Sequence, residues 1–178
     1  MNTTEDIVEM ARKLFAALVR KSADVRMNVQ NESEQTVIFT VSGDPEDVPR
    51  IVGQRGAHFL SVKSLVEIAC STNRTKKIVL YKVEEPPVRI TKPWQRFEYN
   101  PKWPRKEIQE LLARTLTIVL GCHDLTVKAD EGTGTHCLMT VDVIGGHREH
   151  IAVVSEACNK IFSSIGVTHG IGLTIEIG

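Results

Sequence analysis

The sequence of 178 residues lacks the long hydrophobic runs of membrane proteins. No window approaches the roughly 18 consecutive apolar residues of a membrane-spanning helix. Residues 1–6 are polar and acidic, without the basic start and apolar stretch of a secretory signal. We therefore expect a cytoplasmic protein with no membrane partner.

Cysteine is scarce and has none of its usual spacings. The four cysteines lie far apart, with no C-x-x-C pair, which argues against zinc sites and small disulfide frameworks. We expect reduced, mostly buried thiols. His147 and His150 stand three apart and His123 follows Cys122, but no third ligand at suitable spacing accompanies them. The sequence predicts no metal.

Local signatures of catalysis are also absent. The chain contains no G-x-S-x-G nucleophile motif and no Walker-type G-x-x-x-x-G-K sequence. We expect a protein that is not an enzyme, with no catalytic residues and no cofactor.

A net charge of zero argues against a nucleic-acid partner, but the charge is unevenly distributed. Residues 1–83 contain 12 Lys and Arg against 10 Asp and Glu, a net of +2. Residues 84–106 have a net of +3, and residues 107–178 a net of −5. Any RNA surface is expected in the first half and the linker. The acidic second half is a candidate for contact with another protein or with the basic arm of its own chain.

Apolar periodicity predicts an ordered series of elements in residues 1–83. A helix is expected over 5–21, capped by Thr3 or Thr4, followed by strands near 25–29 and 36–41. Asp44 is a natural N-cap and Pro45 a natural first residue of a short helix reaching 50–52. A second helix begins at Ala57, and a strand over 76–83 closes the unit. The apolar stripes of the two long helices are Ile7, Met10, Ala11, Leu14, Phe15 and Leu18, and Phe59, Val62, Leu65, Val66 and Ala69.

We expect residues 84–104 to be a proline-rich linker or docking arm. Its prolines exclude regular structure, and cations alternate with four aromatic residues, Trp94, Phe97, Tyr99 and Trp103. These aromatics either stack on RNA bases or pack the arm between the two halves, and packing is the favoured interpretation.

From residue 105 the apolar pattern of the first half starts again, which predicts a tandem duplication. Ile108 lies 101 positions after Ile7, and Val141 lies 100 after Val41. Beyond that point the offset falls to 92, with Gly145 on Gly53. The second copy therefore lacks about eight residues in the place of the short helix. Its loop reads Gly145-Gly146-His147-Arg148, with arginine where the second glycine is expected.

The loop Gly53-Gln54-Arg55-Gly56 carries the functional prediction. A GxxG tetrapeptide alone is weakly informative, but this one opens directly onto a predicted helix. Backbone N–H groups and the positive end of the helix dipole then converge on one spot, which favours an anion. Glycines let the backbone approach a phosphate closely and adopt positive φ. Gln54 and Arg55 add a neutral donor and a cation, appropriate to a sugar-phosphate strand.

The element order and the stretch PEDVPRIVGQRGA, residues 45–57, resemble the prokaryotic-type (type II) K-homology (KH) domain. The resemblance covers residues 1–83 well and residues 105–178 only as a degenerate copy. It implies that unpaired nucleotides lie in a groove, held by the loop on one side and by the sheet on the other. Gln54 stands where many members of the family have lysine.

Carried over to this chain, the resemblance implies roles for individual residues. It places the phosphates on Gly53, Gln54, Arg55 and Gly56. It further implies apolar contacts to the bases from Val52 and Phe59 or Leu60, and a cationic rim of Arg50, His58 and Lys63. The altered second loop is not expected to form a working clamp.

Together these observations predict an α+β protein of two tandem type II KH-like α-β-β-α-α-β units, the second lacking the short helix. The expected domains are an RNA-binding unit, residues 1–83, the linker arm, residues 84–104, and a degenerate unit, residues 105–178. The expected function is non-catalytic binding of single-stranded RNA. The alternative is a KH-fold regulator that docks on RNA-processing or transcription machinery without binding nucleic acid.

Overall fold

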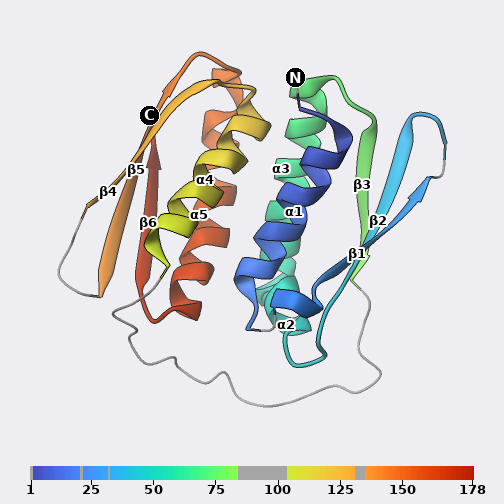
Figure 1. Cartoon of the computed structure of the whole chain (residues 1–178), viewed down its shortest axis with the longest axis horizontal. Coiled ribbons are helices and arrows are strands. Elements are labelled where there is room, and N and C mark those ends of the chain that lie inside the picture. The colour runs from blue at the N-terminus through green and yellow to red at the C-terminus, as the bar shows by residue number, and fades with distance from the viewer. Residues whose placement is uncertain (1, 21, 32, 84–103, 131–134) are drawn as a thin grey trace.

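The computed structural model describes residues 2–20, 22–31, 33–83, 104–130 and 135–178. The chain is an α+β protein built from long helices and two small sheets (Figure 1). Of the predicted linker arm, only Pro104 falls within the described residues, so the aromatic residues at 94–103 lie outside them.

The first half follows the predicted order of elements. Its elements are α1 (Thr4–Leu18), β1 (Arg26–Asn31), β2 (Thr36–Ser42), α2 (Val48–Val52), α3 (Ala57–Asn73) and β3 (Lys77–Val83). A 3-10 turn, Gln54–Gly56, separates α2 from α3.

The second half repeats this order without the short helix. Its elements are α4 (Arg105–Leu120), β4 (Asp124–Asp130), β5 (His136–Ile144), α5 (Ile151–Thr168) and β6 (Gly172–Ile177). Between β5 and α5 the six residues form only a bend and a 3-10 turn, Arg148–His150.

The two sheets have the same topology. In each, the first two strands are antiparallel and the third lies parallel to the second, giving the orders β1-β2-β3 and β4-β5-β6. The register also repeats, since Met27 pairs with Val41 in the first sheet and Val127 with Val141, 100 positions later, in the second.

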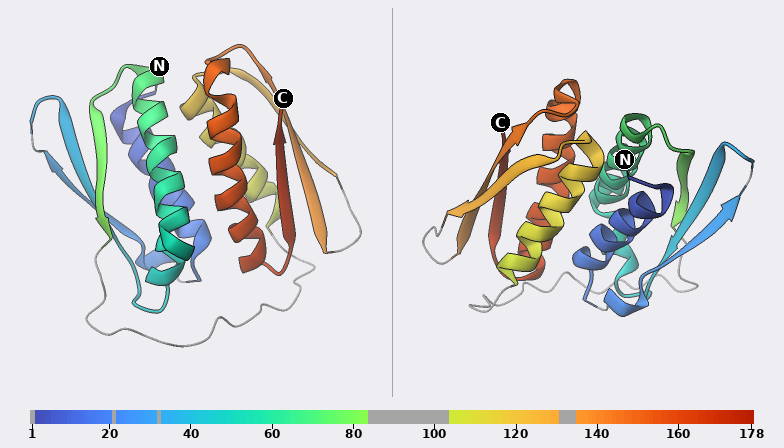
Figure 2. Two further views of the ribbon diagram at one scale, coloured as in Figure 1. Left: turned by 180° about the vertical axis from the view of Figure 1, so that it is seen from behind. Right: turned by 45° about the horizontal axis from the view of Figure 1, so that its top comes forward.

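The helices lie between the sheets. Figure 1 shows one sheet on each outer side, with α1 and α3 covering the first and α4 and α5 the second. Seen from behind, α3 and α5 run side by side through the middle of the molecule (Figure 2). Buried apolar residues of both halves form one continuous core, so the helices pack on their own sheet and on the opposite helices.

Local sequence explains where α1 forms. The Thr3 hydroxyl accepts a hydrogen bond from the Asp6 backbone N–H, and the Asp6 carboxylate accepts one from the Thr3 N–H at 2.8 Å. This capping box confirms the predicted start of the helix. All six residues of the predicted apolar stripe are buried.

The predicted start of α2 is wrong. Asp44 and Pro45 lie in a turn, and the helix begins only at Val48 after an N-cap at Asp47. The Asp44 carboxylate accepts a hydrogen bond from the Glu46 N–H at 2.9 Å, and the Asp44 carbonyl accepts one from the Asp47 N–H at 2.8 Å. An Asp side chain can stabilise a turn as readily as it caps a helix, and here the turn prevails.

Candidate nucleic-acid interface

The loop Gly53–Gly56 lies between the end of α2 and the start of α3 at Ala57. Three of its residues have positive φ, 74° at Gly53, 53° at Arg55 and 80° at Gly56. The Gly53 N–H donates to the Pro49 carbonyl at 2.9 Å, and the Gly56 N–H donates to the Gly53 carbonyl at 3.1 Å. The loop is therefore a defined turn, held by its own backbone and pointing into the first turn of a 17-residue helix.

The two glycines are required for different reasons. A β-carbon at Gly53 would lie 2.6 Å from His58 Cγ and 2.8 Å from the His58 backbone nitrogen. A β-carbon at Gly56 would meet nothing nearer than Leu60 Cδ1 at 3.8 Å, so only its positive φ favours glycine. The absence of a side chain at Gly53 lets the loop fold tightly onto His58.

Gln54 and Arg55 are the exposed residues of the loop. The left-handed conformation of Arg55 costs a residue with a side chain about 1–2 kcal/mol. Such strain persists where the surrounding structure enforces it and is concentrated at functional sites. The guanidinium of Arg55 is thus exposed to solvent beside the N-terminus of α3, a position that suits contact with a phosphate.

His58 connects the loop to the rest of the molecule. Its Nδ1 lies 2.6 Å from the Arg50 carbonyl oxygen, in the helix that precedes the loop. Its Nε2 lies 2.5 Å from Ser164 Oγ, on α5 of the second half. Both ring nitrogens therefore have partners within the protein, so the ring bridges α2 and α5 beside the loop.

Arg50 is also placed differently from the prediction. It is 8% exposed, and its Nε lies 3.9 Å from the Asp47 carboxylate, which is itself buried. Burial lowers the pKa of the Arg50 guanidinium, and nearby Arg20 lowers it further, while Asp47 acts in the opposite direction. Arg50 is thus buried, because α2, the helix that precedes the loop, packs against the core.

Arg20 is a cation near the loop that sequence reasoning did not select. It is exposed, and its backbone N–H donates to the Asp47 carboxylate at 3.3 Å. The positive charge of Arg20 also lowers the pKa of the Arg50 guanidinium. The only sequence signal for Arg20 is its place just beyond the end of α1, since proximity to α2 depends on the tertiary fold.

The remaining predicted residues divide between surface and core. Phe59 is partly buried and its ring stacks on Phe15, with centroids 6.2 Å apart. Leu60, by contrast, is 56% exposed in the first turn of α3. Val52 and Lys63 are partly exposed. Of the two apolar candidates for base contact, Leu60 is therefore the more accessible, because the helix turns Phe59 toward the core.

The second loop, Gly145–Arg148, has a different conformation. Gly145 and Gly146 have positive φ, but Arg148 does not, although it occupies the position of Gly56. The His147 N–H donates to the Leu120 carbonyl, and Arg148 Nη2 donates to the Val143 carbonyl, each at 2.9 Å. The Arg148 guanidinium therefore binds the preceding strand of its own half.

Other chemistry has little support among the described residues. They contain no group of three or more His, Cys, Asp or Glu side chains that could hold a metal ion. All four cysteines are buried and unpaired, and burial raises the pKa of each thiol, for Cys158 to about 12. Such thiols are poor nucleophiles. No helix within the described residues is both long and apolar enough to span a membrane.

No protein-family model and no curated protein sequence matches the chain.

Proposed function

We propose that the chain is a non-catalytic RNA-binding protein of two type II KH-like units, and that the loop Gly53–Gly56 binds the backbone of single-stranded RNA. The observation that carries this proposal is the backbone of Arg55. An exposed arginine in a left-handed conformation, between two positive-φ glycines and before a long helix, places a cation beside the positive end of the helix dipole.

The composition of the loop favours a phosphodiester strand. Gln54 and Arg55 present hydrogen-bond donors outward, and neither side chain is buried. Leu60, one turn into α3, offers an exposed apolar surface against which a base can pack. Phosphate contacts and apolar base contacts within one helical turn match the way such domains hold unpaired nucleotides.

The titration that tests the proposal uses a short fluorescent single-stranded RNA of mixed sequence at about 50 and about 200 mM salt, because binding through phosphates weakens with salt. The double variant Gln54→Asp/Arg55→Asp is compared with His147→Asp/Arg148→Asp in the second loop. The two variants change the formal charge equally. Loss of binding in the first alone supports the loop as the site, and equal loss in both contradicts it.

A second candidate function is suggested by the second half. Ile144 is 68% exposed and Val153 52% exposed, on either side of the second loop, and residues 107–178 have a net charge of −5. Exposed apolar residues on an acidic surface favour a protein partner over a polyanion. Absence of binding to any RNA in the titration, with the fold intact, would favour a protein-interaction regulator.

A further inference from the structure

The first loop is fastened to the second half of the chain through one side chain. His58 follows the loop, and its two ring nitrogens contact Arg50 of α2 and Ser164 of α5. We propose that the second half is a working part of the RNA site, in which Ser164 positions His58 and, through it, the loop Gly53–Gly56. This inference rests on the proposed function and assigns a role to the second half within it.

Hydrogen-bond chemistry defines how the contact operates. The Arg50 carbonyl oxygen can only accept, so Nδ1 of His58 must carry the proton at that contact. In the neutral ring Nε2 is then an acceptor, and the Ser164 hydroxyl donates to it. Ser164 therefore favours the tautomer that also holds the last turn of α2, which leads directly into the loop.

The ring is also packed against the loop itself. The space that a side chain at Gly53 would need is taken by the His58 ring and backbone. Because a tilt of the ring would press on Gly53 or leave a gap beneath it, the position of the imidazole and the conformation of the loop depend on each other. His58 is in this sense a positioning residue for Gln54 and Arg55.

The surface that carries Ser164 is firmly attached to the first half. Thr168 Oγ1, one turn further along α5, lies 3.4 Å from the Leu18 carbonyl oxygen. At the other end of the contact between the halves, buried Asn73 donates to the Ile118 carbonyl at 2.7 Å. With a continuous apolar core between these points, α5 provides a fixed support for His58.

The duplicated half provides an internal comparison. At the offset of 92 that aligns the two loops, His150 corresponds to His58, and Ser164 corresponds to Thr72. The equivalent hydrogen bond is not formed. Thr72 Oγ1 is buried without a hydrogen-bond partner, and Nε2 of His150 lies 4.0 Å from the Glu149 carboxylate instead. The hydrogen bond between a histidine and a hydroxyl is therefore formed beside the first loop, which has the GxxG sequence. It is missing beside the second loop, which does not have this sequence.

The test compares Ser164→Ala with Thr72→Ala, which removes the corresponding hydroxyl at the other end. RNA affinity is measured by titration of the full chain, and melting temperature monitors the fold. Losing this hydrogen bond should lower the fraction of molecules whose loop is held ready for RNA, and so weaken RNA binding in Ser164→Ala by up to about tenfold. Ser164→Thr should restore affinity, and Thr72→Ala should bind like the parent protein. Equal affinities in Ser164→Ala and the parent would overturn the proposal.

A double-mutant cycle separates positioning from general stability. His58→Asn keeps a donor near the Arg50 carbonyl but cannot reach Ser164. Adding Ser164→Ala to His58→Asn should then weaken binding no further, because the two changes remove the same contact. Additive losses would mean that Ser164 acts independently of His58, which contradicts the inference.

A readout without RNA distinguishes failure of this inference from failure of the proposed function. In ¹⁵N spectra of the free protein, Ser164→Ala should mix the tautomers of His58 and speed hydrogen exchange at the Gly56 amide. Thr72→Ala should change neither. If the parent protein bound no RNA, the proposed function would be contradicted. These spectra would still test whether Ser164 positions the loop through His58. Unchanged spectra in Ser164→Ala would overturn the support itself.

Discussion

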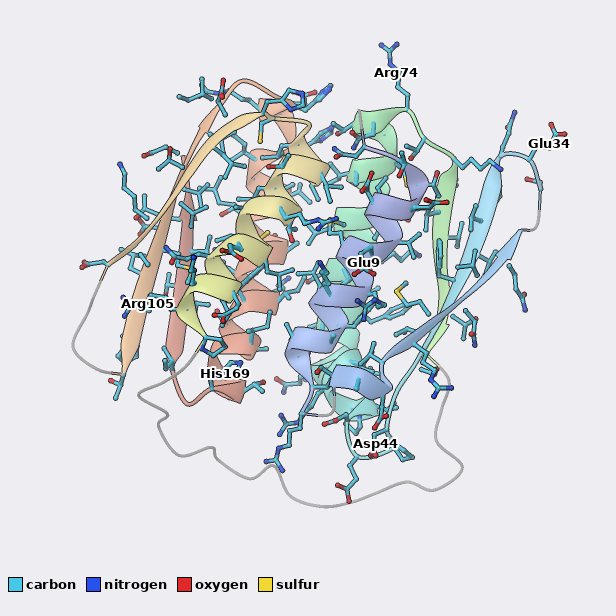
Figure 3. The ribbon with its side chains drawn as sticks, viewed as in Figure 1. Glu9, Glu34, Asp44, Arg74, Arg105 and His169 are labelled. Carbon is cyan, nitrogen blue, oxygen red and sulfur yellow. The ribbon has the colours of Figure 1, made fainter. Side chains whose placement is uncertain are left out.

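Arg55 and Arg74 are the two non-glycine residues with positive φ in the described part of the chain, at 53° and 51°, and they flank the two ends of α3. Arg55 precedes the helix, in the candidate RNA loop. Arg74 ends it at the opposite side of the molecule and extends into solvent (Figure 3). The same strain therefore occurs once at the proposed site and once away from it.

This pair gives a matched prediction. Arg55→Gly and Arg74→Gly should each raise the free energy of unfolding by up to about 1 kcal/mol, because relief of left-handed strain outweighs the added freedom of the unfolded chain. Only Arg55→Gly should weaken RNA binding, and the slope of log affinity against log salt should fall by about 0.7. Denaturant titration and RNA titration measure the two effects. A similar loss of RNA affinity in Arg74→Gly would argue against a localised site.

A second prediction concerns Gly53. Gly53→Ala places a methyl group against the His58 ring and backbone at a position with positive φ, and should lower the free energy of unfolding by about 3 kcal/mol. Gly56→Ala and Gly145→Ala introduce the conformational cost alone and should lower it by about 1 kcal/mol. Chemical denaturation checks the order. Equal costs at Gly53 and Gly56 would show that the loop does not pack on His58.

A third prediction concerns Arg50. Because it is buried beside Asp47, Arg50→Ala should destabilise the fold by about 3 kcal/mol by leaving a buried carboxylate with one partner fewer. If Arg50→Ala binds less RNA, the loss should be proportional to the fraction of the protein that is unfolded. Measuring affinity below the melting temperature, per folded molecule, separates the two. Weak binding by fully folded Arg50→Ala would indicate direct contact with RNA.

The position of α1 was predictable because its information is local. Thr3 and Asp6 are three residues apart, and the apolar stripe that follows is entirely buried. The start of α2 was missed because the Asp44 side chain can serve either a turn or a helix cap, and sequence alone does not separate them. Local competition of this kind limits the prediction of boundaries.

The candidate site was predictable only in part. The position of the loop before α3 was predictable because GxxG next to a helix start is a local pattern. The burial of Arg50 and the approach of Arg20 depend on how α2 packs against α1. The contact between His58 and Ser164 joins residues 106 positions apart, and no sequence pattern predicts it. These features of the candidate site depend on long-range packing, which local sequence patterns do not predict.

A fourth prediction concerns pH. His169 ends α5, and burial lowers its pKa below the ordinary value of 6.5. The unfolded chain then binds a proton more readily than the folded protein, so stability should decrease as the pH falls through 6.5 toward the lower folded-state value. His169→Gln should remove part of this dependence. Denaturation at several pH values measures it, and an unchanged pH profile in His169→Gln would assign the dependence to other groups.

The most direct measurement of the central claim is a map of the RNA footprint on the full chain. Backbone ¹⁵N chemical shifts are followed while a short single-stranded RNA is added. The account predicts that the largest changes fall on residues 53–56 and the first turn of α3, with residues 145–148 little affected. Changes centred on the second loop, or no changes with any RNA, would contradict it.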